Sequence, residues 1–187
     1  IGGVRLLRQL GISPSVYHLN EGHSAFLTLE LAREFLTASP EANFVDSIAA
    51  VREQCVFTTH TPVSAGNDVF PTETLADCFD ADFIASLKLS EQEFFALGRT
   101  DPDNADEPFG MTPLAIRMCR SANGVSEKHG EVSRDLWRAM FPGEIEASDV
   151  PITHVTNGVH APTWVAPLFQ ELYGRSIAEN WPTMLRD

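Results

Sequence analysis

Short apolar segments alternate along this chain with longer segments of helical periodicity, and this alternation restricts the fold more than any other feature. The predicted strands are SPSVYHLN at 13–20, CVFTTH at 55–60 and a third within PITHVTNGVH at 151–160, which ends in a turn. Apolar residues at three- and four-residue spacing predict the helices, at 1–10, 22–38, 43–54, 73–87, 111–121, 126–140 and 163–173. Strands separated by helices favour parallel pairing, so we predict an α/β fold with a parallel sheet and flanking helices. The strands are short enough to be buried on both faces.

Composition excludes several classes of function. The 187 residues are 43% hydrophobic, which suffices for one sizeable core or for a domain and part of another. The net charge of −13, without basic clusters, argues against nucleic acid as a partner. No apolar run approaches the roughly 18 residues of a membrane span. Three widely spaced cysteines predict a reduced, cytoplasmic setting. The start, IGGVRLL, lacks a methionine, and we interpret the chain as an interior piece of a longer protein.

Polar side chains follow each predicted strand at the point where it ends. The three groups are Asn20, Glu21 and His23; Thr58, Thr59 and His60; and Thr156, Asn157 and Gly158. In open α/β sheets, ligands bind outside the carboxyl ends of the strands, so we expect these residues to converge there. Neutral donors and acceptors dominate, which is typical of a site for a polyhydroxyl ligand such as a sugar. No phosphate-binding glycine motif is present, so a self-contained nucleotide site is not predicted.

The histidines allow other interpretations. His18 and His23 would lie about 140° apart on a helix and on opposite faces of a strand, and HExxH is absent, so we predict no metal site. A metal-dependent hydrolase that uses His18, His23 and His60 stays open as an alternative. Within strands, His18 and His154 are expected only to satisfy buried backbone groups. For His23 and His60, at strand ends, a functional role is favoured.

Four blocks of the sequence resemble a known family. They are YHLNEGHSAF, FTTHTPVSAGNDVF, NGVSEKHGEVSRDLW and VTNGVHAPTW, and their order and spacing are similar to those of the α-glucan phosphorylases, which act on glycogen, starch and maltodextrin. The chain has NEGH, TTHT and TNGVH where the animal and plant enzymes more often have NDTH, TNHT and TNGIT, so the resemblance is to the bacterial branch. It implies that the parallel sheet with its flanking helices is Rossmann-like and is part of the amino-terminal domain of a two-domain, GT-B type glycosyltransferase. The implied reaction transfers a glucosyl unit from the non-reducing end of an α-1,4-glucan to inorganic phosphate, which gives glucose 1-phosphate.

The resemblance also implies roles for particular residues. His60 matches the histidine whose backbone carbonyl faces the glucosyl unit, where it can stabilise developing positive charge. Asn157 matches an asparagine that hydrogen-bonds glucose hydroxyls, and Asn20 belongs to the same sugar-binding group. Glu21 and His23 match an aspartate and a histidine along the oligosaccharide path.

The remaining matched residues have an expected architectural part near the site. Asn123 and Gly124 are expected to be turn residues, and His129 is expected to be packed or hydrogen-bonded. Gly124 and Gly158 suit tight turns where backbones approach closely.

The family uses pyridoxal phosphate, bound to a lysine that matches neither lysine of this chain. The cofactor is therefore expected only in the longer protein, and this chain alone is expected to be inactive. Residues 1–157 would belong to the first domain, and residues 158–187 would cross into the second. Exposed strand edges and apolar faces predict self-association. A catalytically inert carbohydrate-binding protein remains the non-enzyme alternative.

Overall fold

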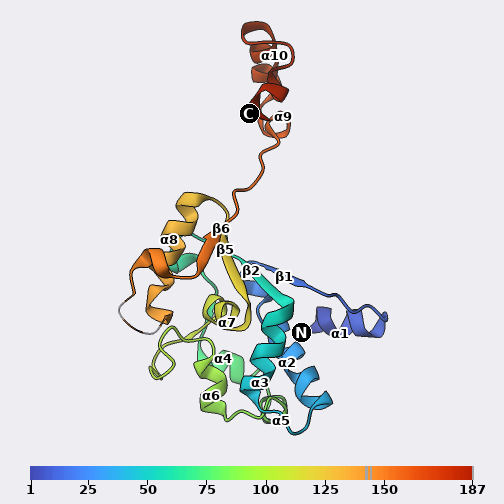
Figure 1. Cartoon of the computed structure of the whole chain (residues 1–187), viewed down its shortest axis with the longest axis vertical. Coiled ribbons are helices and arrows are strands. Elements are labelled where there is room, and N and C mark those ends of the chain that lie inside the picture. Colours follow the sequence, from blue (N-terminus) through green and yellow to red (C-terminus); the bar gives the residue numbers. More distant parts are fainter. Residues whose placement is uncertain (142, 144, 187) are drawn as a thin grey trace. The chain divides into compact units, whose positions relative to one another are not determined.

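The computed structural model describes residues 1–141, 143 and 145–186. The chain forms two compact units, Ile1–Thr156 and Asn157–Asp187. The first unit contains a parallel sheet with helices around it, as the alternation of strands and helices predicts. The second consists of short helices (Figure 1).

The sheet has four parallel strands in the order β1-β2-β5-β6. Their bounds are β1 Tyr17–Asn20, β2 Cys55–Thr58, β5 Ser121–Gly124 and β6 Ile152–His154. In the register of the sheet, Asn20 lies opposite Thr58, and Thr58 lies opposite Asn123. This pairing sets three polar side chains in a row across the strand ends. A separate antiparallel pair joins β3, Val69–Phe70, to β4, Phe109–Gly110.

The first unit has eight α-helices among its described residues. They are α1 Gly2–Gln9, α2 Leu27–Ala38, α3 Phe44–Gln54, α4 Thr72–Ala76, α5 Ala81–Ser86, α6 Glu91–Ala96, α7 Met111–Met118 and α8 Glu127–Trp137. Short 3-10 turns complete it, namely η1 Gly22–Ser24, η2 Ser64–Gly66, η3 Arg138–Met140 and η4 Ala147–Asp149. The single helix expected at 73–87 is two helices, because Asp80 has an extended backbone and its side chain caps a new helix at the N–H of Phe83.

Capping boxes set the start of two helices. Asn43 and Asp46 exchange side-chain and backbone hydrogen bonds at the start of α3, and Ser90 and Glu93 do the same at α6. The core between the layers is built from buried side chains of both strands and helices. Its largest fully buried members include Leu19, Leu29, Phe57, Phe94, Phe109, Leu114 and Met118.

Strand β1 is not buried on both faces as expected. Tyr17 and Leu19 are buried, whereas His18 and Asn20 are exposed. One face of β1 therefore contributes to the core, and the other presents polar side chains.

Strand β5 is absent from the sequence prediction. Its residues, Ser-Ala-Asn-Gly, are small or turn-forming, and none is β-branched or aromatic, so no local signal marks them as a strand. Pairing with β2 and β6 imposes the extended conformation. Asn123 and Gly124 are thus strand residues, and the expectation that they form a turn is wrong. A Cβ at Gly124 would lie 2.9 Å from both Gly130 N and His129 Nδ1, so the close approach of α8 requires glycine here.

The second unit contains α9, Ala161–Trp164, α10, Pro167–Ser176, and η5, Trp181–Arg186. Proline lies in the first turn of α9 and of α10, where its missing N–H is not needed. The rings of Tyr173 and Trp181 pack edge to face with their centroids 5.2 Å apart.

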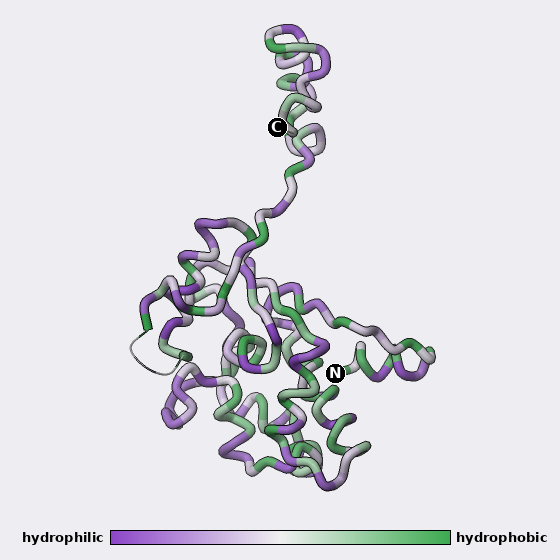
Figure 2. Tube along the Cα trace, in the orientation of Figure 1, coloured by the Kyte–Doolittle hydropathy of each residue, from purple (hydrophilic) through white to green (hydrophobic). Residues whose placement is uncertain are grey.

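Hydrophilic and hydrophobic residues are mixed along the described part of the trace (Figure 2). In the described part of the chain, no helix combines the length and the apolar character that crossing a bilayer requires. The expected cytoplasmic location stays a prediction.

Candidate functional site

A line of hydrogen bonds joins three strands at the carboxyl edge of the sheet. The Thr58 hydroxyl donates to Asn123 Oδ1 at 3.0 Å, and His18 Nε2 lies 2.8 Å from Thr58 Oγ1. A hydroxyl has one proton, and Thr58 gives it to Asn123, so His18 Nε2 must be the donor to Thr58. The proton on Nε2 fixes the tautomer of a neutral His18 ring.

His60 and Asn20 meet beside this line. Strand β2 ends at Thr58, and His60 follows two residues later with an exposed side chain. Its Nε2 lies 2.5 Å from Asn20 Oδ1. The backbone ladder also continues past the strands, because Glu21 N donates to Thr58 O at 2.9 Å and Thr59 N donates to Asn123 O at 3.0 Å. The expected convergence of the first two strand ends is therefore present.

Glu21 lies at the junction of these strand ends in an unusual conformation. Its φ of 84° and ψ of 163° fall in a region that is essentially confined to glycine and costs about 1–3 kcal/mol for another residue. Its carboxylate accepts hydrogen bonds from Gly22 N at 3.1 Å and from His60 N at 2.7 Å. The Thr61 hydroxyl donates to the same group at 3.1 Å.

Other residues singled out in the sequence lie elsewhere. His23, in η1, is exposed and lines an apolar pocket of about 600 Å³ together with residues of α1 and the start of α2, such as Val4, Leu7 and Leu27. Asn157 and Gly158 begin the second unit and are exposed, and their expected convergence with the other strand ends stays a prediction.

His129 lies buried in the first turn of α8. Its Nδ1 accepts from Val125 N at 3.1 Å, and its own N–H donates to the capping hydroxyl of Ser126 at 3.1 Å. Because Nδ1 is an acceptor, a neutral ring has its proton on Nε2. These bonds fix the turn that leads from β5 into α8.

Sequence reasoning missed His18 and Thr61. His18 was expected to satisfy buried backbone groups, but it is exposed and bonds a side-chain hydroxyl. The alternation within YHLN could have revealed it, since residues two apart in a strand share a face and Asn20 was already a candidate. No sequence signal marks Thr61, because its contact with Glu21 depends on the conformation of Glu21.

The arrangement does not favour a metal centre. Within the described residues, no group of three or more His, Cys, Asp and Glu side chains is placed to hold a metal ion. Nε2 of His18 contacts Thr58 and Nε2 of His60 contacts Asn20, so one of the two ring nitrogens of each histidine already has a protein partner.

The lysines of the chain do not fit a pyridoxal phosphate site. Lys88 Nζ lies against the carbonyl oxygens of Pro40 and Ala42, and Lys128 pairs with Glu131 at 2.7 Å on the surface. Both lysines are exposed, and their amines contact oxygen atoms of the protein. A Schiff base requires an amine that is free to react.

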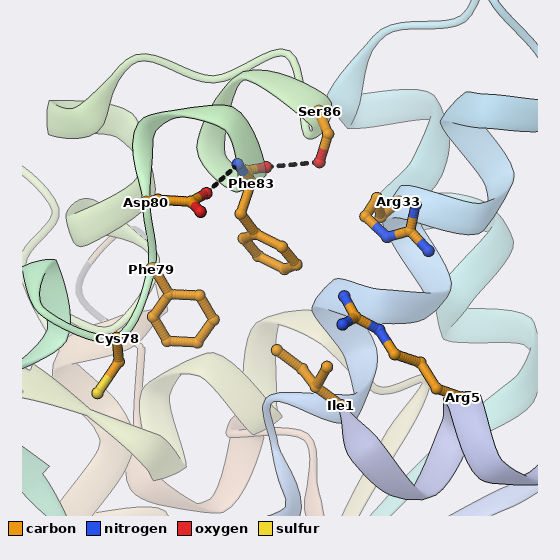
Figure 3. Close-up of a pocket in the computed structure, with 8 residues that line it drawn as sticks. All are labelled: Ile1, Arg5, Arg33, Cys78, Phe79, Asp80, Phe83 and Ser86. Atoms are coloured by element: carbon orange, nitrogen blue, oxygen red, sulfur yellow. Dashed lines mark hydrogen bonds between the residues drawn. The ribbon is translucent and has the colours of Figure 1, made fainter.

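The pocket in Figure 3 is separate from the strand ends. It has a volume of about 550 Å³ and is lined by residues of α1, α2, α5 and the segment before α5. Arg5 and Arg33 lie beside each other there, but both are paired with Glu30. None of its lining residues belongs to a strand.

The strand-end site therefore presents hydrogen-bonding imidazole and amide groups, those of His18, Asn20 and His60. They lie next to the polar side chains of Thr58 and Asn123. Its one carboxylate, that of Glu21, is occupied by protein donors. Such a surface can align hydroxyl groups of a ligand and offers no cationic clamp for a charged one.

No protein-family model matches this chain. It is 39% identical to the maltodextrin phosphorylase of Thermococcus litoralis over 181 residues, which cover 97% of the chain and 20% of that protein. It is 42% identical to the glycogen phosphorylase of Mycobacterium tuberculosis, over 95% of the chain and 21% of that protein. It is 32% identical to the glycogen phosphorylase of Aquifex aeolicus, over 96% of the chain and 25% of that protein.

The chain thus spans about a fifth to a quarter of the length of these curated relatives. Identity at this level along almost the whole chain agrees with the four motif blocks. The resemblance that the motifs indicate is confirmed: the chain is homologous to one stretch of the glycogen and maltodextrin phosphorylases.

Proposed function

We propose that this chain forms one wall of the active site of an α-glucan phosphorylase. The complete enzyme would transfer a glucosyl unit from the non-reducing end of glycogen or maltodextrin to inorganic phosphate. The observation that carries the proposal is the row of neutral hydrogen-bonding side chains at the carboxyl edge of a parallel sheet, in a chain whose relatives have phosphorylase names. Sugars are recognised by such oriented donors and acceptors.

In this proposal, His60 supplies the catalytic group. Its backbone carbonyl would face the glucosyl unit and stabilise positive charge as the glycosidic bond breaks. Asn20 would help to bind the sugar, and its contact with the His60 ring supports a shared role. The substrate-binding roles of His23 and Asn157 stay proposals. Asn123, Gly124, His129 and Gly158 would support the site.

The sheet would belong to the amino-terminal domain of a GT-B type enzyme, within residues 1–157, and residues 158–187 would lead into the second domain. Pyridoxal phosphate would be held by a lysine outside this chain, because neither Lys88 nor Lys128 fits that part. The cofactor supplies proton chemistry through its phosphate group. The residues of this chain would bind and orient the glucan, and the chain alone would show no turnover.

Phosphorolysis of a maltooligosaccharide tests the proposal. The product of the complete reading frame is assayed with and without pyridoxal phosphate, beside the 187-residue chain. Glucose 1-phosphate should form only with the cofactor-loaded complete protein. If that protein is folded and loaded but forms no product, the phosphorylase assignment fails, and binding of a glucan without turnover becomes the better account of the site.

A further inference from the structure

The backbone at Glu21 is held from both sides. Its N–H donates to Thr58 O, which continues the β1–β2 ladder by one residue. On the other side, Gly22 is pressed against the start of α7, because a Cβ there would lie 3.2 Å from Met111 Cβ and Thr112 Oγ1. The glycine-type conformation of Glu21 is thus imposed by its neighbours, and a glutamate in this place needs compensating contacts.

Those contacts come from the carboxylate. Oε2 accepts from His60 N at 2.7 Å and from the Thr61 hydroxyl at 3.1 Å. Oε1 accepts from Gly22 N at 3.1 Å, with a longer contact of 3.5 Å from the Thr59 hydroxyl. A carboxylate has about four acceptor positions. Three of them accept from protein donors within 3.1 Å, and the fourth faces the Thr59 hydroxyl at 3.5 Å, so the carboxylate is directed at the protein and not at a ligand.

Three of these four donors belong to the segment Thr59–Thr61 that leaves β2. The carboxylate of Glu21 therefore fastens the exit of β2 to the exit of β1. The N–H of His60 is its closest partner, and a hydrogen bond to a charged acceptor is about twice as strong as one between neutral groups. This hydrogen bond fixes the backbone of His60, whose exposed ring contacts Asn20.

We propose that Glu21 is a positioning residue, which orients His60 through its backbone N–H and does not itself contact the sugar. This proposal rests on the proposed function only in taking a glucan as the ligand of the site. The family resemblance implies instead that Glu21 lies along the oligosaccharide path, and the positioning role takes the place of that expectation. The strained backbone aims the carboxylate inward, and the bonds to residues 59–61 hold it there.

Amide hydrogen exchange of the 187-residue chain tests this role without any assay of activity. In Glu21→Gln the acceptor loses its charge, and one terminal atom becomes a donor. The His60 amide should then exchange about 10-fold faster or more. The Thr59 amide, which donates to Asn123 O, is the internal reference and should change about 2-fold or less. The His60 ring resonances should move towards those of free histidine, while those of His18 stay in place.

Glu107→Gln is the matched control. Its carboxylate also accepts from two backbone amides, those of Thr100 at 2.7 Å and Asp101 at 3.0 Å, but in the loop before β4. This variant should leave the exchange of the His60 amide unchanged. Glu21→Gly is the second test variant, because glycine suits the backbone conformation and removes the carboxylate. It should fold and reproduce the faster exchange of His60.

Unchanged exchange of the His60 amide in both folded Glu21 variants would overturn the proposal. If Glu21 instead contacts the sugar, both Glu21 variants should leave the exchange of the His60 amide unchanged. In the complete protein, the same substitutions should weaken the binding of maltoheptaose. If the wild-type complete protein binds no maltoheptaose, the proposed function is contradicted. The exchange result would still decide whether Glu21 orients His60.

Discussion

The carboxylate of Glu30, in α2, accepts two hydrogen bonds from the guanidinium of Arg5, in α1, each at 2.9 Å. The Glu30 side chain is fully buried, and Arg33 adds a third bond at 2.6 Å. Burial alone would raise the pKa of Glu30, but the hydrogen bonds from Arg5 and Arg33 outweigh it and lower the pKa to about 2. This group ties α1 to α2.

The Glu30 cluster predicts a specific loss of stability in acid. In the unfolded chain the pKa of Glu30 returns to its ordinary value of 4.5, so the contribution of Glu30 to stability is complete above that pH and is lost as the pH falls from about 4.5 to about 2. Glu30→Gln should lower the free energy of unfolding by up to about 3 kcal/mol at neutral pH, because it removes the buried charge whose bonds to Arg5 and Arg33 lower the pKa of Glu30. The deficit relative to wild type should shrink through the acid window. Urea unfolding at several pH values measures both effects.

Glu34→Gln is the control for this prediction. Glu34 pairs with Arg8 at 2.9 Å, also between α2 and α1, but both side chains are partly exposed. Such a pair contributes about 0–1 kcal/mol. Equal losses in the two variants would show that burial of Glu30 does not set the strength of its cluster.

Thr58→Val tests the hydrogen-bond line across the sheet. Valine has nearly the same shape as threonine, but it removes the donor to Asn123 and the acceptor for His18. The free energy of unfolding should fall by about 1–2 kcal/mol, and the His18 ring resonances should shift. Thr37→Val, at an exposed position of α2, should change stability by about 0.5 kcal/mol or less. A Thr58 variant as stable as wild type would mean that the line adds nothing to the fold.

Self-association should be visible in solution. Strands β1 and β6 end the order of the sheet, and Trp164 and Leu168 in the second unit are 80% and 79% exposed. Unpaired edges and exposed apolar side chains favour contact between copies. Sedimentation equilibrium should give a mass that rises with concentration above that of one chain. Trp164→Ser with Leu168→Ser should reduce the rise, whereas Val45→Ser, on α3, should not. A constant mass of one chain would contradict this prediction.

The sequence predicts most of the first unit because its elements have strong local signals. Helical periodicity indicates most of the helices, and apolar runs indicate β1 and β2. Asn20 and His60 converge as expected, because parallel neighbours bring their carboxyl ends to one edge.

Two features of the site have no local signal. Strand β5 is made of residues that are small or favour turns, and pairing with its neighbours in the sheet gives it the extended conformation. The carboxylate of Glu21 reaches the residues after β2 because Glu21 has a positive φ, which sequence patterns predict only for glycine. Both features arise from tertiary contacts that overrule local preference.

Gly124→Ala tests the tertiary contact that gives β5 its last residue. The added Cβ would lie 2.9 Å from the backbone nitrogen of Gly130 and from His129 Nδ1, so either α8 or the strand end must shift. The free energy of unfolding should fall by about 1–3 kcal/mol, as in other overpacked sites. Gly3→Ala is the control with the opposite sign. Gly3 lies in α1 with nothing within 4 Å of its would-be Cβ, so alanine should stabilise the helix by up to about 1 kcal/mol. Urea midpoints that move in these opposite directions would show that glycine at 124 serves the packing of α8 on β5. A Gly124 variant with the wild-type midpoint would contradict that close approach.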